Sequence, residues 1–127
     1  MTEATKKRPA PWSDVENWSL CSLYAAMSLR AVNGMEYNKA EMIRQARGQG
    51  LGTIDAEPSP DYPLSYRSRA SIEAKLMNLT AVLLDLGLTT YSMERHGYKA
   101  LSNYQASLKE TAQKYWHLQL EEMEKSA

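Results

Sequence analysis

The feature that most constrains this chain is a row of aliphatic residues within the stretch RSRASIEAKLMNLTAVLLDLGL, residues 67–88. Large side chains recur there at intervals of four, three, four and three residues: Ile72, Leu76, Leu79, Leu83 and Leu86. Because an α-helix turns once in about 3.6 residues, these intervals place the whole row on one face. Ser68 before the row is a favourable N-cap, and Gly87 after it is a favourable C-terminal stop. The pattern predicts a helix over residues 68–87 whose apolar face belongs to the core.

Capping signals predict three further helices. The stretch SDVE is a capping box, in which a serine and a glutamate satisfy each other's backbone amides, and it predicts a helix over residues 13–32 with Gly34 as its stop. The stretch NKAE offers a capped start for a short helix over residues 38–47. The stretch SNYQ, from residue 102, is a third capping box and predicts the start of the last helix.

The helix over residues 13–32 carries apolar residues over a wide arc. One side holds Val15, Trp18, Ala25, Ala26, Leu29 and Val32. Another side holds Leu20, Tyr24 and Met27. An apolar surface this wide predicts a central helix with neighbours on more than one side.

The whole pattern predicts an all-α fold, a compact bundle of about four helices. Runs of alternating β-branched residues are almost absent. Residues 48–66 hold three glycines and three prolines and predict a long loop between the second and third helices. On the last helix, the residues expected to face inward are Tyr104, Leu108, Ala112, Tyr115, and either Leu118 or Met123.

The length of 127 residues fits one domain. We expect a flexible basic arm at residues 1–11, a single helical domain at 12–120 and an acidic, fraying tail at 121–127. The chain has no apolar run long enough to cross a bilayer, and no apolar stretch follows its basic start as in a secretory signal. A cytoplasmic protein is therefore expected.

The residue types needed for catalysis or metal binding are scarce. Cys21 is the only cysteine, which excludes a disulfide within the chain and a cysteine-based zinc site. The two histidines, His96 and His117, have no neighbours that form a catalytic motif. We expect no cofactor and no enzyme activity.

The polar flank of the helix over residues 68–87 is the best candidate binding site. Ser71, Lys75 and Asn78 lie together beside the apolar face, and Arg67, Ser68 and Arg69 stand at the N-terminal end, where free amides favour an anion. Arg44 and Arg47 share a face of the preceding helix, and the loop between the helices allows the two groups to converge. These residue types contact DNA phosphates and base edges. Alternatively, the arginines only cap and solubilise a helix start while Lys75 pairs with a neighbouring acid.

The charge balance argues against a bulk DNA binder, and the aromatic composition is compatible with either a core edge or an interface. Fifteen basic and fifteen acidic residues give zero net charge, whereas domains that hold DNA by bulk electrostatics are typically basic. Three Trp and eight Tyr without any Phe mean that every aromatic ring carries a hydrogen-bonding group, a type favoured at interfaces and also at core edges. The candidate anchors for a protein partner are Tyr62, Tyr66, Tyr91 and Trp116.

Two ordered motifs resemble a known family. The stretches RSRASIEAKLMNLTAVLLDLG and GYKALSNYQASL are similar to the N-terminal head domain of McrA-like, modification-dependent restriction endonucleases of the HNH type. The matching positions are Arg67, Ser68, Ser71, Ile72, Glu73, Lys75, Asn78, Ala81, Val82, Leu83, Gly97, Tyr98, Lys99, Asn103 and Gln105. The resemblance covers most of residues 12–108 and implies a helical DNA-contacting or assembly module, since the nuclease of that family lies in a later domain. The longer, proline-rich segment at 48–66 and Ala100 in place of a proline depart from the family pattern.

Two hypotheses follow from the sequence. The first is a non-catalytic module of a bacterial or phage defence-related protein that contacts double-stranded DNA through the basic face, with Lys99 as a further contact. The second is a protein-binding module, such as a phage- or mobile-element-encoded inhibitor of a defence nuclease complex (an anti-restriction or anti-CRISPR protein), or a self-associating subunit. A membrane partner is not expected, and the oligomeric state is not predicted.

Overall fold

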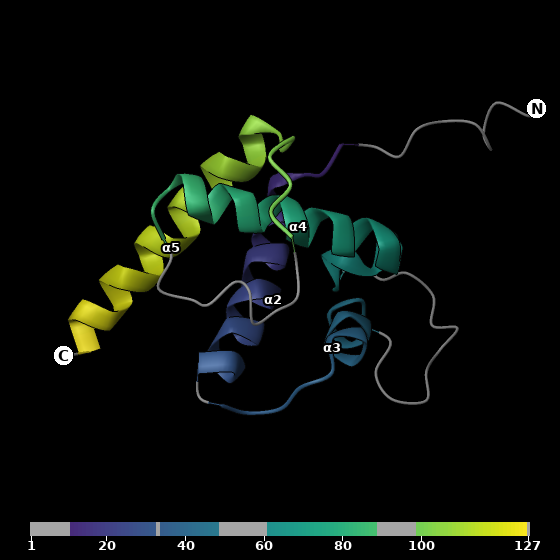
Figure 1. Ribbon diagram of the computed structural model, residues 1–127, viewed down its shortest axis with the longest axis horizontal. Coiled ribbons are helices and arrows are strands. Elements are labelled where there is room, and N and C mark those ends of the chain that lie inside the picture. Colours follow the sequence, from purple (N-terminus) through teal and green to yellow (C-terminus); the bar gives the residue numbers. More distant parts are fainter. Residues whose placement is uncertain (1–10, 33, 49–60, 89–98, 127) are drawn as a thin grey trace, which may run out of the picture.

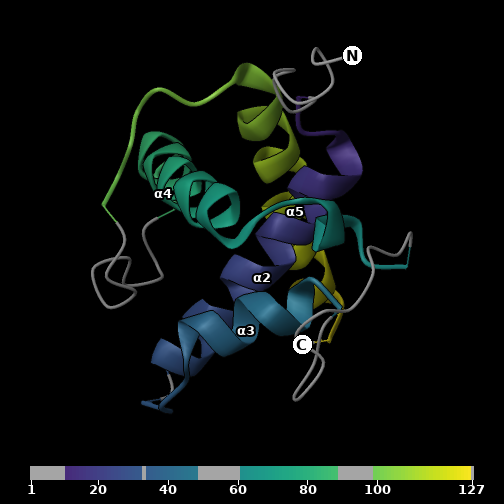
Figure 2. The same ribbon diagram turned by 90° about the vertical axis from the view of Figure 1, so that its right-hand side faces the viewer.

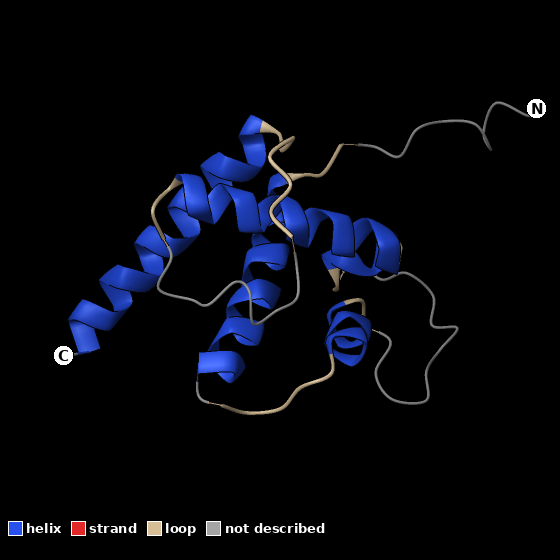
Figure 3. Cartoon of the chain, viewed as in Figure 1, coloured by secondary structure: helices blue, strands red, loops and turns tan. Residues whose placement is uncertain are grey.

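The computed structural model describes residues 11–32, 34–48, 61–88 and 99–126. Its α-helices are α2 (Asp14–Val32), α3 (Lys39–Ala46), α4 (Arg69–Asp85) and α5 (Ala106–Ser126), and a short 3₁₀ helix, η1 (Pro63–Tyr66), precedes α4. Within these residues there is no strand (Figure 3). The predicted all-α bundle of four helices is confirmed.

Helix α2 is the central element. It packs against α3, η1, α4 and α5, while α4 packs against both α3 and α5 (Figures 1 and 2). The central position predicted for this helix is confirmed. Its two apolar sides differ, however, because Val15 and Leu29 are 61% and 60% exposed. Only the side with Leu20, Tyr24 and Met27 is fully buried, so the wide apolar arc is half core and half surface.

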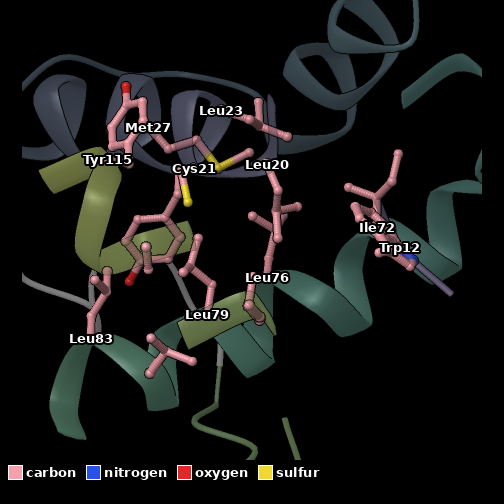
Figure 4. Close-up of a cluster of buried hydrophobic side chains, with 14 of the residues drawn as sticks. Trp12, Leu20, Cys21, Leu23, Met27, Ile72, Leu76, Leu79, Leu83 and Tyr115 are labelled. Atoms are coloured by element: carbon pink, nitrogen blue, oxygen red, sulfur yellow. The ribbon is translucent and has the colours of Figure 1, made fainter. Parts of the chain in front are cut away.

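The core lies where the apolar face of α4 meets α2 (Figure 4). The predicted row supplies four fully buried side chains: Ile72, Leu76, Leu79 and Leu83. Leu86, the last of the row, is partly buried against the same cluster. Full burial of one such side chain contributes about 1.5–3 kcal/mol, so this face supplies a large part of the stability.

The predicted helix starts are confirmed at three of four positions. Ser13 Oγ accepts from the Glu16 amide at 3.2 Å, and Glu16 Oε1 accepts from the Ser13 amide at 2.9 Å, which completes the capping box. Asn38 caps α3 at 3.0 Å, and Ser68 caps α4 by accepting from the Ser71 amide at 3.1 Å. Beyond α4, Gly87 has a φ of +73°, the left-handed conformation that glycine adopts without strain.

The start of the last helix was predicted three residues too early, with Ser102 as the N-cap. Residues 101–105 are not helical, and α5 begins at Ala106. The two residues between Ser102 and Gln105, the predicted capping pair, make tertiary contacts: Asn103 accepts from Asn78, and the Tyr104 hydroxyl donates to the Asp85 carboxylate. These contacts hold residues 103–104 against α4, outside the helix.

The inward face and the end of α5 also differ from expectation. Leu108, Ala112 and Tyr115 are buried as predicted, but Leu118 is 45% exposed and Trp116 is buried. Helix α5 continues through residues 121–126, where a fraying tail was expected.

Some expectations fall outside the described residues. These are the basic arm over residues 1–10, most of the predicted loop at 49–60, and residues 89–98 with Tyr91 and His96. The described end of the loop forms η1, which the glycine and proline content did not predict. Pro63 stands at the first position of η1, where its missing N–H costs nothing, and Leu64 is buried against α2.

Candidate nucleic-acid interface

Arg67, the expected leading phosphate contact, is a buried ion-pair residue. Its Nε donates to Glu16 Oε2 at 2.6 Å, and its Nη2 donates to Glu16 Oε1 at 2.8 Å and to the Pro11 carbonyl at 3.2 Å. Only 8% of Arg67 is exposed. The hydrogen bond from Arg67 holds the pKa of Glu16 below its ordinary value, and the same bond raises the pKa of Arg67. This guanidinium joins the chain before α4 to the first turn of α2 and is not available to a phosphate.

Trp12 lies at the centre of the same cluster. The Arg67 guanidinium carbon is 5.0 Å from the centre of the indole ring, and Lys75 Nζ is 5.7 Å from it. Trp12 itself is buried, and Figure 4 shows it beside Ile72 of α4. Two cations on one ring form a cation–π arrangement that fixes the chain entering α2 against α4.

Arg47 completes the junction from α3. Its Nε donates to the Arg67 carbonyl at 2.7 Å, so the end of α3 is fastened to the start of α4. The convergence of the two arginine groups expected from the sequence is confirmed for Arg47 and Arg67. Arg44, one turn earlier, is partly buried and pairs with Glu41 at 2.9 Å.

Lys75 differs from these arginines because it makes no hydrogen bond or ion pair with a described residue. Its ammonium lies over Trp12, and no carboxylate in the described part of the chain pairs with it. Burial and the neighbouring Arg67 charge lower the pKa of Lys75 below its ordinary value. The expected alternative, a lysine paired with a neighbouring acid, is therefore wrong for the described residues. Three cationic side chains, Arg47, Arg67 and Lys75, meet at this junction against the one carboxylate of Glu16.

The other polar residues of the flank have structural roles. Asn78 is buried and donates from Nδ2 to the Leu101 carbonyl at 2.9 Å and to Asn103 Oδ1 at 3.0 Å. It holds the segment before α5 against α4 and has no amide hydrogen left for a base edge. Ser68 is occupied as the N-cap, while Ser71 is half-buried one turn before Lys75.

Arg69 and Lys99 lie apart from this junction. Arg69 is about 160° round the helix from Ser71 and forms an exposed pair with Glu73 at 3.2 Å. Lys99 is exposed, two residues before Leu101, whose amide donates to the Met77 carbonyl at 3.1 Å. The structure thus separates the predicted set into a junction around Lys75 and two isolated surface cations.

The residues expected to anchor a protein partner have different environments. Tyr62 and Tyr66 are exposed on either side of η1, as an anchor requires, and Tyr91 lies outside the described residues. Trp116 is only 4% exposed, so it cannot insert into a partner, and its indole nitrogen has no hydrogen-bond partner among the described residues.

Sequence reasoning missed Trp12 and Glu16 as members of the junction. Glu16 was assigned to the capping box alone, although its carboxylate serves both the cap and Arg67. A tryptophan just before a capped helix start was the available signal for a ring that packs on a neighbouring element.

The described residues contain no group of three or more His, Cys, Asp or Glu side chains placed to hold a metal ion. Burial raises the pKa of the Cys21 thiol to about 12, so it carries little thiolate at neutral pH. None of the described helices is long and apolar enough to cross a membrane. Comparison with protein-family models, curated proteins and solved structures gives no match to this chain.

Proposed function

We propose that this protein is a cytoplasmic, non-catalytic helical module that contacts the phosphate backbone of DNA through Lys75, with Ser71 and Arg47 beside it. The observation that carries this proposal is the half-buried Lys75 ammonium, which no described carboxylate neutralises. A phosphate would supply the missing negative charge. Lysine suits this role because its compact ammonium contacts phosphate oxygens as a point charge.

Two further observations support a polyanionic partner. Lys6, Lys7 and Arg8 lie within five residues of Pro11 in the sequence, and Pro11 is held at the junction by Arg67. The sequence therefore has three further cations shortly before a residue that the junction holds. Since the whole chain has zero net charge, the excess of positive charge at the junction is local, which favours a small contact over a broad electrostatic surface.

The resemblance to the head domain of McrA-like restriction endonucleases supports a defence-related context. Lys75 and Ser71 are among the positions that carry it. In this proposal Arg67 and Asn78, which carry it too, maintain the fold that presents Lys75. Arg69, Arg44 and Lys99 contribute at most long-range attraction, because they lie away from the junction or are paired.

Fluorescence anisotropy of a labelled duplex of about 20 base pairs, titrated at several salt concentrations, tests this function. We expect binding that weakens with salt, and Lys75→Met should lower the slope of log K against log salt by about 0.9, the value for one phosphate contact. The matched control is Lys125→Met, which removes the same charge from the last turn of α5, away from the junction. Equal slopes for Lys75→Met and the wild type, or no duplex binding at low salt, would contradict the proposal.

A second candidate is a protein-binding module, either an inhibitor of a defence nuclease complex or a self-associating subunit. Val15, Trp18 and Leu29 favour it, because they lie along one side of α2, at 61%, 37% and 60% exposed. Exposed apolar residues grouped on one helix are typical of interaction surfaces. Sedimentation equilibrium of the purified protein distinguishes the self-associating form from a monomer that requires a different partner.

A further inference from the structure

A groove lies at the opposite end of α4 from the Lys75 junction. It has a volume of about 430 Å³, within the range of about 300–1,000 Å³ typical of binding pockets. Figure 1 shows the end of α4 beside the middle of α5, the region from which its walls come. The lining residues are Leu86, Leu88, Gln113, Lys114, Trp116, His117 and Leu120.

The groove has an apolar floor and a polar rim on one side. Leu86 and Leu88 pack against the core, and the buried Trp116 forms part of the groove wall. Leu120 is 51% exposed, although it is a large apolar side chain. Apolar side chains left partly open to water in a concave site are stabilised when an apolar group covers them.

The rim supplies hydrogen-bond donors without matching acceptors. Lys114 and Gln113 are both exposed, and neither bonds to another residue in the described ranges. His117 Nε2 lies 3.1 Å from Glu121 Oε2 on the same helix. The lysine therefore remains an available partner for a negative charge.

We propose that this groove binds a short segment of a partner protein in which a large apolar side chain is flanked by Asp or Glu. The apolar side chain covers Leu120 and the wall formed by Trp116, and the acidic neighbour pairs with Lys114. The groove is open at the surface, which suits a side chain projecting from a partner's backbone. The sequence predicted that Trp116 inserts into a partner. In this proposal it instead lines the groove that receives a side chain of the partner.

This inference is independent of the phosphate contact, because Lys75 lies in the second turn of α4, whereas the groove lies between the residues that follow α4 and the middle of α5. A test of one site leaves the other unaffected. Duplex binding should be unchanged in any variant made in the groove.

The experiment uses a fluorescein-labelled peptide of about 12 residues, in which leucines recur at helical spacing among glutamates. Anisotropy measures its binding to the full chain, and a second peptide with lysine in place of every glutamate tests the charge preference. We expect the acidic peptide to bind, with Leu120→Lys weakening it about tenfold or more, as for an anchor position. Lys114→Glu should weaken the acidic peptide and strengthen the basic one.

Leu118→Lys provides the matched control. Leu118 is on the same helix and 45% exposed, similar to Leu120, but it does not line the groove. Its variant should bind the acidic peptide within about twofold of the wild type. An equal loss in both leucine variants, equal binding of both peptides, or no saturable binding at about 1 mM peptide would overturn the proposal.

Discussion

The two ends of α4 are attached to the neighbouring helices by different kinds of contact. At its start, Arg67 fastens α4 to α2, Arg47 fastens it to α3, and Trp12 is packed between two cations. At its end, contact with α5 is apolar, and Leu86 and Leu88 line a groove that the described residues leave open. The start of α4 is held mainly by an ion pair and hydrogen bonds of charged side chains. The end is held by apolar contacts that leave some apolar surface exposed.

This difference shows which residues at each end are available to a partner. A buried charge without a counter-charge is costly, so most cations at the start of α4 are committed to the fold. Lys75 is the exception, because it makes neither a hydrogen bond nor an ion pair with a described residue. An apolar side chain tolerates partial exposure at modest cost, so the end of α4 leaves several side chains available. A cluster of arginines in a sequence is therefore weaker evidence for a binding surface than one unpaired lysine in a structure.

The largest effect should come from breaking the charged end. Glu16→Ala removes the carboxylate that Arg67 contacts through two nitrogen atoms and leaves a buried guanidinium unpaired. Breaking one side of a buried ion pair costs about 3–5 kcal/mol, and the lost capping box adds to it. Urea denaturation measures the change in the free energy of unfolding.

Glu73→Ala is the control for this prediction, because it breaks the exposed pair with Arg69 and should change stability by less than about 1 kcal/mol. The lowered pKa of Glu16 also makes this stabilisation depend on pH. Since the folded-state pKa lies below the ordinary value of 4.5, the stabilisation is complete above pH 4.5 and is lost as the pH falls through the lowered pKa. The stability difference between wild type and Glu16→Ala should therefore shrink below pH 4.5. Equal losses for Glu16→Ala and Glu73→Ala would mean that the buried pair does not hold this end together.

The fold was largely predictable because its signals are local. The row from Ile72 to Leu83 and the caps at Ser13, Asn38 and Ser68 depend on spacings of three or four residues, and all are confirmed. The start of α5 was wrong for the same reason. The local pattern SNYQ satisfies the capping rule, but Asn103 is engaged with Asn78, 25 residues away.

The site was only partly predictable because it depends on distant pairs. Arg67 and Glu16 are 51 residues apart, and no local pattern indicates that one will neutralise the other. Convergence of Arg47 with Arg67 was predictable, because a single connection separates them. The groove was not predictable, because it requires the exposure of Leu120 and the burial of Trp116, only four residues apart on one helix.

A change in the middle of α4, at Asn78, should lower the stability by an intermediate amount. Asn78→Ala removes both hydrogen bonds that hold residues 101–103 against α4. Loss of a buried side-chain amide with two partners should cost about 1–3 kcal/mol, and thermal unfolding measures the change. Hydrogen exchange at the Leu101 amide, which donates to the Met77 carbonyl, should quicken because the segment loses its neighbouring attachments. Asn103→Ala removes only one of the two bonds and should have the smaller effect. If both variants are as stable as the wild type, the segment is held by other contacts.

The smallest effect, and the one that most sharpens the comparison, is a gain of stability. Lys75→Met keeps an apolar stem over Trp12 and removes a charge that no described carboxylate neutralises. Because the folded-state pKa of Lys75 lies below 10.5, the charged form is disfavoured by folding, and this penalty is present at neutral pH. It disappears as the pH rises through the lowered pKa towards 10.5, where the folded and unfolded chains lose the proton alike.

After allowance for solvent screening, we expect Lys75→Met to be more stable than wild type by on the order of 0.5 kcal/mol at pH 7, and by less at alkaline pH. Urea denaturation at the two pH values measures both quantities, and a less stable Lys75→Met variant would contradict the expectation. A variant that gains stability but binds duplex less well would identify Lys75 as a residue kept for binding at the expense of the fold.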